Sequence, residues 1–288
     1  MSRKRALMEA ISDLPTLKAS RMKNNTSHES VENGYTIQKK TSEPSDYVKE
    51  LNGNTSPVLI FNHKARYNND RDIEIFSRLK PGEDSTAESI KDINPYKSRD
   101  GIFKDKYYKL RPDVVCKTIT AHMKHDCNMY IHPNQARGLT VREAARIQGF
   151  PDNYVFCGKL GAMYRQIGNA VPPPLAKIIA SAIRPETLPK KKVRVLDLCA
   201  GIGGFRAGCS LVKNPDIEFE VVGFAEIDKY AKKAYESMYS TEHEADIGDI
   251  KSFTRKDGDD FQGGFLKRSA SRSKTIRENV PNHDILFA

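Results

Sequence analysis

The sequence predicts an α/β protein in which a parallel sheet forms the C-terminal part and a larger, irregular region precedes it. Three observations predict this class. The apolar run 193–198 has the composition of a strand buried on both faces of a parallel sheet. A glycine-rich turn, 200–204, follows it and leads into a helical pattern at 205–211. A second strand, 219–225, and a second helix, 229–239, then repeat the order, as in a nucleotide-binding sheet.

The first 57 residues are polar and are expected to be largely irregular. Arg5 to Leu14 predicts a short helix that Pro15 ends. Lys23 to Glu50 is rich in Asn, Ser, Thr, Glu and Lys, which predicts loop or partial disorder. Further along, Ile73 to Gly82 has a helical pattern that a Pro-Gly pair ends.

The segment from Cys116 to His132 has β-branched and aromatic residues on either side of a turn near 125–128, which predicts a hairpin. It also contains four side chains of metal-ligating type: His122, His125, Cys127 and His132. Their spacing matches no zinc geometry, so turn and strand positions are favoured and no metal site is expected.

Leu139 to Pro151 is the clearest helix in the sequence. Thr140 and Glu143 have the spacing of a capping box, in which each side chain bonds to the other residue's backbone. Arg142 and Arg146 lie four residues apart and therefore on one face. Such a face is either solvated or in contact with a phosphate or with the scaffold.

Tyr164 to Ile183 predicts a loop that enters a helix. Five apolar side chains recur at helical spacing and are expected to pack against the core: Leu175, Ile178, Ile179, Ala182 and Ile183. The preceding QIGNAVP, 166–172, is too specific for a generic helix cap. Residues 184–192 are rich in charge and proline and predict a linker that can reach about 30 Å at most.

Acidic residues stand where the predicted strands end. Asp197 lies near the end of the first strand, Glu226 follows the second, and Asp246 or Asp249 would end the third. An acid at the tip of the second strand is placed to accept hydrogen bonds from a ribose diol.

The last part of the sequence combines a polar insertion, 251–281, with a final apolar segment. Lys267 to Arg277 holds five cationic residues and no acid, which favours a solvated loop, with a DNA-facing loop as the alternative. His283 to Ala288 has the pattern of a buried strand, and no crossover helix follows it in the sequence. The sheet is therefore expected to be incomplete in this chain.

Composition limits the classes of protein. The 288 residues carry a net charge of +10 and a pI near 9.2, which suggests a polyanionic partner such as nucleic acid. No apolar run approaches the roughly 18 residues of a transmembrane helix, and the first residues lack the pattern of a signal peptide. Five cysteines without paired spacing fit a reducing cytoplasm.

Three sets of motifs resemble bacterial DNA (cytosine-5) methyltransferases. LTVREAARIQGFPD at 139–152 resembles the family's ninth block, and QIGNAVPPPLA at 166–176 resembles the tenth. DLCAGIGGF at 197–205 and EIDKYA at 226–231 resemble the first and second. The usual order ends with the ninth and tenth blocks, whereas here they come first. The resemblance thus implies a circularly permuted form, in which 184–192 joins the two usual termini.

The resemblance implies a Rossmann-like sheet that binds S-adenosyl-L-methionine (SAM), with double-stranded DNA as substrate, in a bacterial cytoplasm at the nucleoid. Residues 1–136 would form the target-recognition region, 137–183 the helices that close it and the cofactor site, and 193–288 the first part of the catalytic domain. The implied cofactor loop consists of Asp197, Cys199, Gly201, Ile202, Gly203 and Gly204, with Cys199 as a packing residue. The other implied contacts are Glu226 to the ribose, Ile227 to the adenine ring, Asp246 rather than Asp249 to the adenine amine, and Asn169 and Ala170 beside the methionine end.

One part of the family's pattern is missing. The family's nucleophile is a cysteine in a Pro-Cys-Gln motif, which attacks C6 of a flipped-out cytosine. Residues 283–288 resemble the strand that leads into that motif, but the motif itself does not occur. Glu278-Asn279-Val280 spells the family's Glu-Asn-Val motif but precedes that strand, so it is interpreted as a chance match.

The resemblance therefore implies a methyltransferase component without a catalytic residue of its own, in a restriction-modification system. The cysteine is expected in a second polypeptide or in a missing C-terminal part, and the chain alone is expected to be inactive. The alternative is a noncatalytic SAM- and DNA-binding module or an inactive truncated product.

Overall fold

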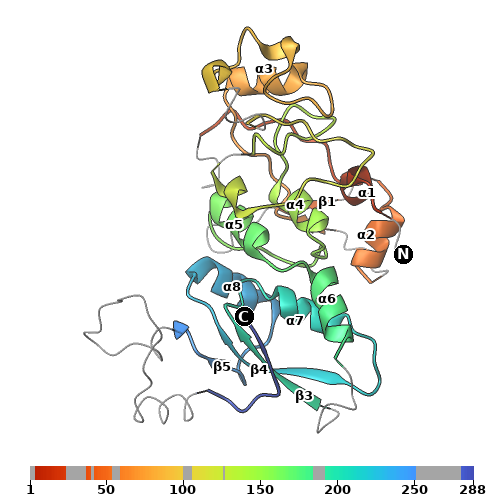
Figure 1. The fold of residues 1–288 in the computed structure, drawn as a ribbon, viewed down its shortest axis with the longest axis vertical. Coiled ribbons are helices and arrows are strands. Elements are labelled where there is room, and N and C mark those ends of the chain that lie inside the picture. The colour runs from red at the N-terminus through yellow and green to blue at the C-terminus, as the bar shows by residue number, and fades with distance from the viewer. Residues whose placement is uncertain are drawn as a thin grey trace, which may run out of the picture. The chain divides into compact units, whose positions relative to one another are not determined.

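The computed structural model describes residues 4–23, 37–39, 42–53, 59–99, 106–125, 127–183, 192–250 and 280–288 (Figure 1). The chain divides into two compact units, Met1–Asn169 and Ala170–Ala288, so the boundary falls inside the QIGNAVP segment. Most of the predicted linker and the whole basic segment 267–277 lie outside the described residues. In the described part of the chain, no helix is long and apolar enough to cross a membrane.

In its described residues, the second unit contains a sheet of four parallel strands in the order β5-β4-β3-β6. The strands are β3 (Lys192–Leu198), β4 (Glu218–Ala225), β5 (Ala245–Asp246) and β6 (Ile285–Phe287). The helices of this unit are α6 (Pro173–Ser181), α7 (Gly204–Ser210) and α8 (Lys229–Met238). Strand β3, which precedes the glycine motif, lies inside the sheet (Figure 1). Strands β4 and β5 lie on one side of it, and β6 pairs with its other side. The predicted parallel α/β fold is confirmed.

Burial along β3 explains its central position. Val193, Val195 and Leu196 are each 1% exposed, so side chains on both faces of the strand are covered. Around Val193 and Val195, a core cluster includes Cys209 of α7 and Phe287 of β6. The ring of Phe287 stacks on Phe205 with 4.4 Å between centroids, which attaches the edge strand to the start of α7.

The face of α6 that packs is not the predicted one. Leu175, Ile178 and Ile179 are 49%, 67% and 42% exposed, whereas the small residues Ala176 and Ala180 are buried. The reason is the close approach of α7, because a Cβ placed on Gly208 would lie 2.3 Å from the Cβ of Ala176. Only small side chains fit between helices at this separation, so the larger apolar residues of α6 point elsewhere.

The described residues of the first unit form mostly short helices and loops. Its α-helices are α1 (Leu7–Ile11), α2 (Asp46–Leu51), α3 (Asp70–Arg78), α4 (Val141–Ile147) and α5 (Leu160–Asn169). Strands β1 (Ile37–Lys39) and β2 (Leu59–Phe61) form an antiparallel pair, and the 3-10 helices are η2 (Glu88–Ile90), η3 (Lys97–Arg99) and η4 (Ala121–Lys124). The predicted helices at 5–14, 73–82 and 139–151 are present with shifted or shorter bounds. A loop was predicted for 23–50, but its last residues form the start of α2. Ser45 caps this helix, since its hydroxyl accepts from the Val48 amide at 3.2 Å.

The predicted loop at the start of 164–183 is helical as far as Asn169, because it forms most of α5. Tyr164 is fully buried there, and its hydroxyl donates to the Leu139 carbonyl at 2.5 Å. Gly168 lets α5 lie directly against η4, since a Cβ at this position would be 2.2 Å from the Ala121 nitrogen. The specificity of QIGNAVP thus includes a packing requirement at Gly168.

The hairpin predicted for 116–132 is wrong, because η4 occupies its middle. Arg66 accounts for the difference. Its guanidinium donates to the carbonyls of Met123 at 2.9 Å and His125 at 2.5 Å, which holds this stretch in a helical turn. Among the residues that the structure describes, no group of three or more His, Cys, Asp or Glu side chains could hold a metal ion.

The capping box of α4 is confirmed. The Thr140 hydroxyl accepts from the Glu143 amide at 3.1 Å, and the Glu143 carboxylate accepts from the Thr140 amide at 2.7 Å. Arg137 donates two hydrogen bonds to the same carboxylate, at 2.8 and 2.7 Å. Burial alone would raise the pKa of Glu143, but the charge and hydrogen bonds of Arg137 outweigh it and hold the pKa well below its usual range.

Arg142 and Arg146 contact the scaffold, so a solvated face is wrong. Both side chains are fully buried. Arg146 bridges two buried carboxylates, donating to Asp152 at 2.7 Å and to Asp13 at 3.1 Å. Arg142 donates instead to backbone carbonyls, including that of Pro151 at 2.9 Å. These buried pairs organise the first unit around α4, because a buried guanidinium is stable only when its donors are satisfied.

Candidate cofactor site

The loop between β3 and α7 has the backbone conformation of a ligand cradle. Cys199, Gly201 and Gly203 have φ of 55°, 57° and 81°, in the left-handed region. A Cβ on Gly203 would lie 2.7 Å from the Tyr239 ring, and one on Gly204 would lie 2.2 Å from the Val171 carbonyl oxygen. Glycine is therefore required at both positions, and the first amides of α7 are left without helical partners at the mouth of the loop.

Glu226 joins this loop to the end of the second strand. One carboxylate oxygen accepts from the Gly201 amide at 2.8 Å, and the other accepts from the Asp228 amide at 2.7 Å. Asp228 in turn caps α8 by accepting from the amides of Tyr230 and Ala231 at 2.9 and 3.1 Å. The carboxylate of Glu226 is thus fixed at the rim of the glycine loop.

Asp197 is a buried acid beneath the loop. Asp197 is only 2% exposed. One of its carboxylate oxygens, Oδ2, has no hydrogen-bond partner among the described residues. Burial raises the pKa of Asp197 to about 7; the charge of Arg206 opposes this rise, and those of Glu226 and Glu244 add to it. A buried acceptor without a partner indicates that a donor is missing from the site.

The third predicted acid, Asp246, aligns with Asp197 across the sheet. Phe224 of β4 pairs with Asp197 on one side and with Asp246 on the other. One oxygen of Asp246 accepts from the Gly248 amide at 3.1 Å, and the carboxylate also forms an ion pair with Lys232. The structure therefore brings Asp197, Glu226 and Asp246 to the same, carboxyl-terminal edge of three neighbouring parallel strands.

A cluster around Arg206 supports the loop, and the sequence prediction missed it. The Arg206 guanidinium pairs with Glu244 at 2.7 Å and lies 4.1 Å from the centroid of the Tyr239 ring. It also donates to the Tyr235 hydroxyl at 3.0 Å. Tyr235 lies on α8 and Tyr239 is the C-cap residue that follows it. Their four-residue spacing could have indicated a shared face, but nothing local linked them to Arg206.

The remaining predicted residues differ in exposure. Ile227, predicted to contact an adenine, is 70% exposed, and Ile202 is 1% exposed and belongs to the core. Cys199, predicted as a packing residue, is exposed, so that prediction is wrong. Ala170 precedes the Val171 carbonyl that faces Gly204, within the same unit. Asn169 ends the first unit, so its place beside the cofactor stays a prediction.

Together these features define a class of protein. Glycine amides, fixed acceptors after successive strands and an exposed apolar side chain suit a nucleoside-containing ligand held at the carboxyl edge of a parallel sheet. The family described as C-5 cytosine-specific DNA methylase matches residues 2–184 and 193–265 of this sequence. The chain belongs to that family.

Several named methyltransferases match parts of the chain. A type II methyltransferase of Bacillus paralicheniformis, M.Bpa9945I, is 36% identical over 182 residues, which are 61% of this chain and 39% of that protein. M.DdeI of Desulfomicrobium norvegicum is 32% identical over 193 residues, 62% of this chain and 42% of its own length. M.AgeI of Thalassovita gelatinovora is 49% identical over 82 residues, 28% and 19% of the two chains. The matched segments thus cover less than half of each relative.

Proposed function

We propose that this chain is the SAM-binding and DNA-binding component of a DNA (cytosine-5) methyltransferase of a restriction-modification system. Membership of the C-5 cytosine-specific family supports the reaction, and the type II names of the relatives support the biological setting. The observation that carries the cofactor assignment is the hydrogen bond between Glu226 and the Gly201 amide, because it fixes a ribose-type acceptor on the glycine loop.

The residues at the sheet edge fit SAM, whose role is to supply the methyl group. Glu226 would accept from the ribose hydroxyls, Ile227 would cover the adenine ring, and Asp246 would accept from the adenine amine. Asp197 offers a buried acceptor without a described partner, which suits a polar or cationic group of the ligand. The loop at Cys199, Gly201, Ile202, Gly203 and Gly204 would surround the ligand's centre, with Asn169 and Ala170 beside its methionine end.

The nucleophilic cysteine of the reaction would come from a segment outside residues 1–288, in a second polypeptide or a further part of the protein. Two features of the second unit support an additional segment. In the described residues, β6 pairs only with β3, and Leu286 of β6 is 47% exposed. The larger apolar side chains of α6, those of Leu175, Ile178 and Ile179, are also exposed. A segment that adds a strand beside β6 would bury apolar surface and complete the permuted catalytic domain.

Direct binding tests the cofactor assignment. Isothermal titration of the chain with SAM should give saturable binding, with NAD and ATP as controls that do not compete. The glycine loop has no dinucleotide spacing, and the sequence predicts nucleoside recognition without phosphate. Competition by ATP at equal concentration, or no SAM binding by the folded chain, would contradict the proposed function.

A further inference from the structure

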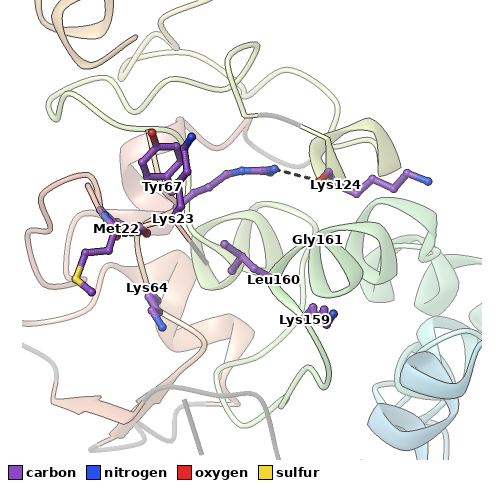
Figure 2. Close-up of a pocket in the computed structure, with 11 residues that line it drawn as sticks. Met22, Lys23, Lys64, Tyr67, Lys124, Lys159, Leu160 and Gly161 are labelled. Carbon is purple, nitrogen blue, oxygen red and sulfur yellow. Dashed lines mark hydrogen bonds between the residues drawn. The ribbon is translucent and has the colours of Figure 1, made fainter. Parts of the chain in front are cut away.

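A basic hollow of about 370 Å³ lies on the first unit, and no predicted cofactor residue lines it (Figure 2). Three stretches that are distant in sequence form it: 20–23, 64–67 and 159–161. The backbone of Lys124 completes the wall, while its side chain extends away from the hollow in Figure 2.

The charge of this hollow is of one sign. Among the described residues, its lining contains no carboxylate, and four residues other than Lys124 carry positive side chains: Lys23, Lys64, Arg66 and Lys159. Like charges gathered in a concave surface focus a positive potential, which lowers the free energy of a bound anion. The hollow thus favours an anionic ligand.

Arg66 gives the hollow a fixed positive charge. Its guanidinium is held by the carbonyls of Met123 and Lys124, at 2.9 and 3.3 Å, and by that of His125. Neutral carbonyls fix the orientation of the guanidinium without cancelling its charge. The lysines around it are flexible and strongly hydrated, so they add charge more than geometry. A fixed guanidinium with flexible lysines around it suits a phosphate group, which it would hold without recognising a particular base.

The other lining groups suit a sugar-phosphate chain. Tyr67 and Leu160 add apolar surface, with the Lys23 ammonium 5.8 Å from the Tyr67 ring centroid. Leu160 and Gly161 form the first turn of α5, a ten-residue helix, whose positive end faces the hollow. The volume exceeds that of one phosphate group and can accommodate an adjoining sugar.

We propose that this hollow binds the sugar-phosphate backbone of duplex DNA. This inference rests on the proposed function and deepens it, because it places a DNA contact partly at 159–161, beyond the predicted recognition region. Such a contact positions the duplex without reading its sequence. Its strength should depend on salt, because each neutralised phosphate releases condensed counterions.

The test compares two double variants of equal net charge. Lys64→Gln with Lys159→Gln removes two cations of the hollow. Lys213→Gln with Lys233→Gln removes two exposed cations that lie outside the predicted recognition region and do not line the hollow. Fluorescence anisotropy with a labelled duplex, measured from low to moderate salt on the full 288-residue chain, gives the affinity and its salt slope.

The hollow variant should bind duplex DNA about tenfold or more weakly at moderate salt. The slope of log K against log salt should fall in magnitude by about 2, since each phosphate contact contributes about 0.9. The control should stay within about twofold of the unaltered chain, with the same slope. Circular dichroism of both variants should match the unaltered chain because the changed side chains lie at the surface.

Three outcomes would overturn the proposal. Equal affinity and slope in the hollow variant would refute the hollow alone, because the unaltered chain would still bind DNA as proposed. Absence of duplex binding by the unaltered chain, with SAM binding retained, would refute DNA binding and the hollow together. Displacement of DNA by inorganic phosphate, but not by chloride of equal ionic strength, would assign the hollow to a free phosphate.

Discussion

Glu226 is the side chain that holds the glycine loop against the end of β4. Each of its oxygens accepts one backbone hydrogen bond within the protein, from Gly201 and from Asp228. A carboxylate oxygen has a second acceptor position. The fixed carboxylate can therefore accept from two ribose hydroxyls without giving up the contacts that shape the loop.

Glu226→Ala is expected to weaken SAM binding about ten- to hundredfold. The substitution removes a hydrogen-bonding partner of the ligand and releases the Gly201 amide, and loss of one such partner costs about 1–3 kcal/mol. Calorimetry with SAM provides the measurement. Glu236→Ala, on the exposed side of α8, is the matched control and should bind as the unaltered chain does. Equal affinity in the two variants would exclude Glu226 as the ribose acceptor.

Asp197 should make the stability of the second unit depend on pH. Its pKa is about 7 in the folded chain, against an ordinary value of 3.8. Between these values the folded state holds a proton that the unfolded state has released. Stability is therefore highest below about pH 4 for this group and falls as pH rises to about 7, by up to about 1.4 kcal/mol per pH unit.

Asp197→Asn should lack this fall. Urea denaturation at several pH values would show the free-energy difference between variant and unaltered chain growing from pH 5 to pH 7 and then levelling. Other titrating groups are common to both proteins and cancel in the difference. Parallel stability curves would show that the Asp197 carboxyl titrates normally in the folded chain.

Two glycines of α5 face η4, and the space beside them differs. A Cβ on Gly168 would lie 2.2 Å from backbone atoms of Thr120 and Ala121, whereas one on Gly161 would lie 3.1 Å from the Lys124 carbonyl oxygen. Contacts below 3 Å with backbone require the two elements to separate. A contact of 3.1 Å requires a shift of only a few tenths of an ångström.

Gly168→Ala should therefore destabilise the chain by about 1–3 kcal/mol or more, the range of overpacked core substitutions. Gly161→Ala should change stability by less than about 1 kcal/mol, because alanine's helix propensity offsets the tighter contact. Urea denaturation midpoints of the two variants give the comparison. A Gly168→Ala variant as stable as Gly161→Ala would mean that α5 and η4 are not in close contact.

Local patterns predicted the elements whose causes are local. The capping box of α4 and the strand, glycine turn and helix of β3 and α7 depend on neighbours within a few residues, and each was found where the sequence predicted it. The predicted hairpin was wrong because Arg66, some 60 residues away in the sequence, donates a hydrogen bond to η4. The predicted packing face of α6 was wrong because Gly208 on α7 lies so close that only small side chains of α6 fit against it.

In the candidate site, too, features with local causes could be predicted from the sequence and those with long-range causes could not. Glu226 and Asp246 could be predicted because acids after parallel strands meet at one edge of the sheet. The support from Arg206, Tyr235, Tyr239 and Glu244 could not, since it joins α7, α8 and the segment before β5 through contacts that no spacing encodes. Asn169 remains a prediction, because it ends one unit while the loop belongs to the other.

At the scale of the whole molecule, the sequence combines the proposed SAM-binding and DNA-binding parts with no nucleophile in the family's motif. In residues 1–288 no Pro-Cys-Gln motif occurs. Burial raises the pKa of Cys116 and of Cys209 to about 12, so neither thiol ionises near neutral pH. Cys199 is exposed at the loop, which makes it the cysteine to examine first.

Methyl transfer should therefore require a segment that carries the Pro-Cys-Gln motif. Cytosine C5 is a poor nucleophile until a thiolate adds at C6, and proximity cannot replace a reactive group that is absent. With tritiated SAM and duplex DNA, the chain alone should give no 5-methylcytosine, and co-expression with such a segment should give turnover. Changing the motif's cysteine to serine should abolish that turnover, whereas Cys199→Ser should preserve it. Methylation by the purified chain alone, lost in Cys199→Ser, would instead place the nucleophile on the glycine loop.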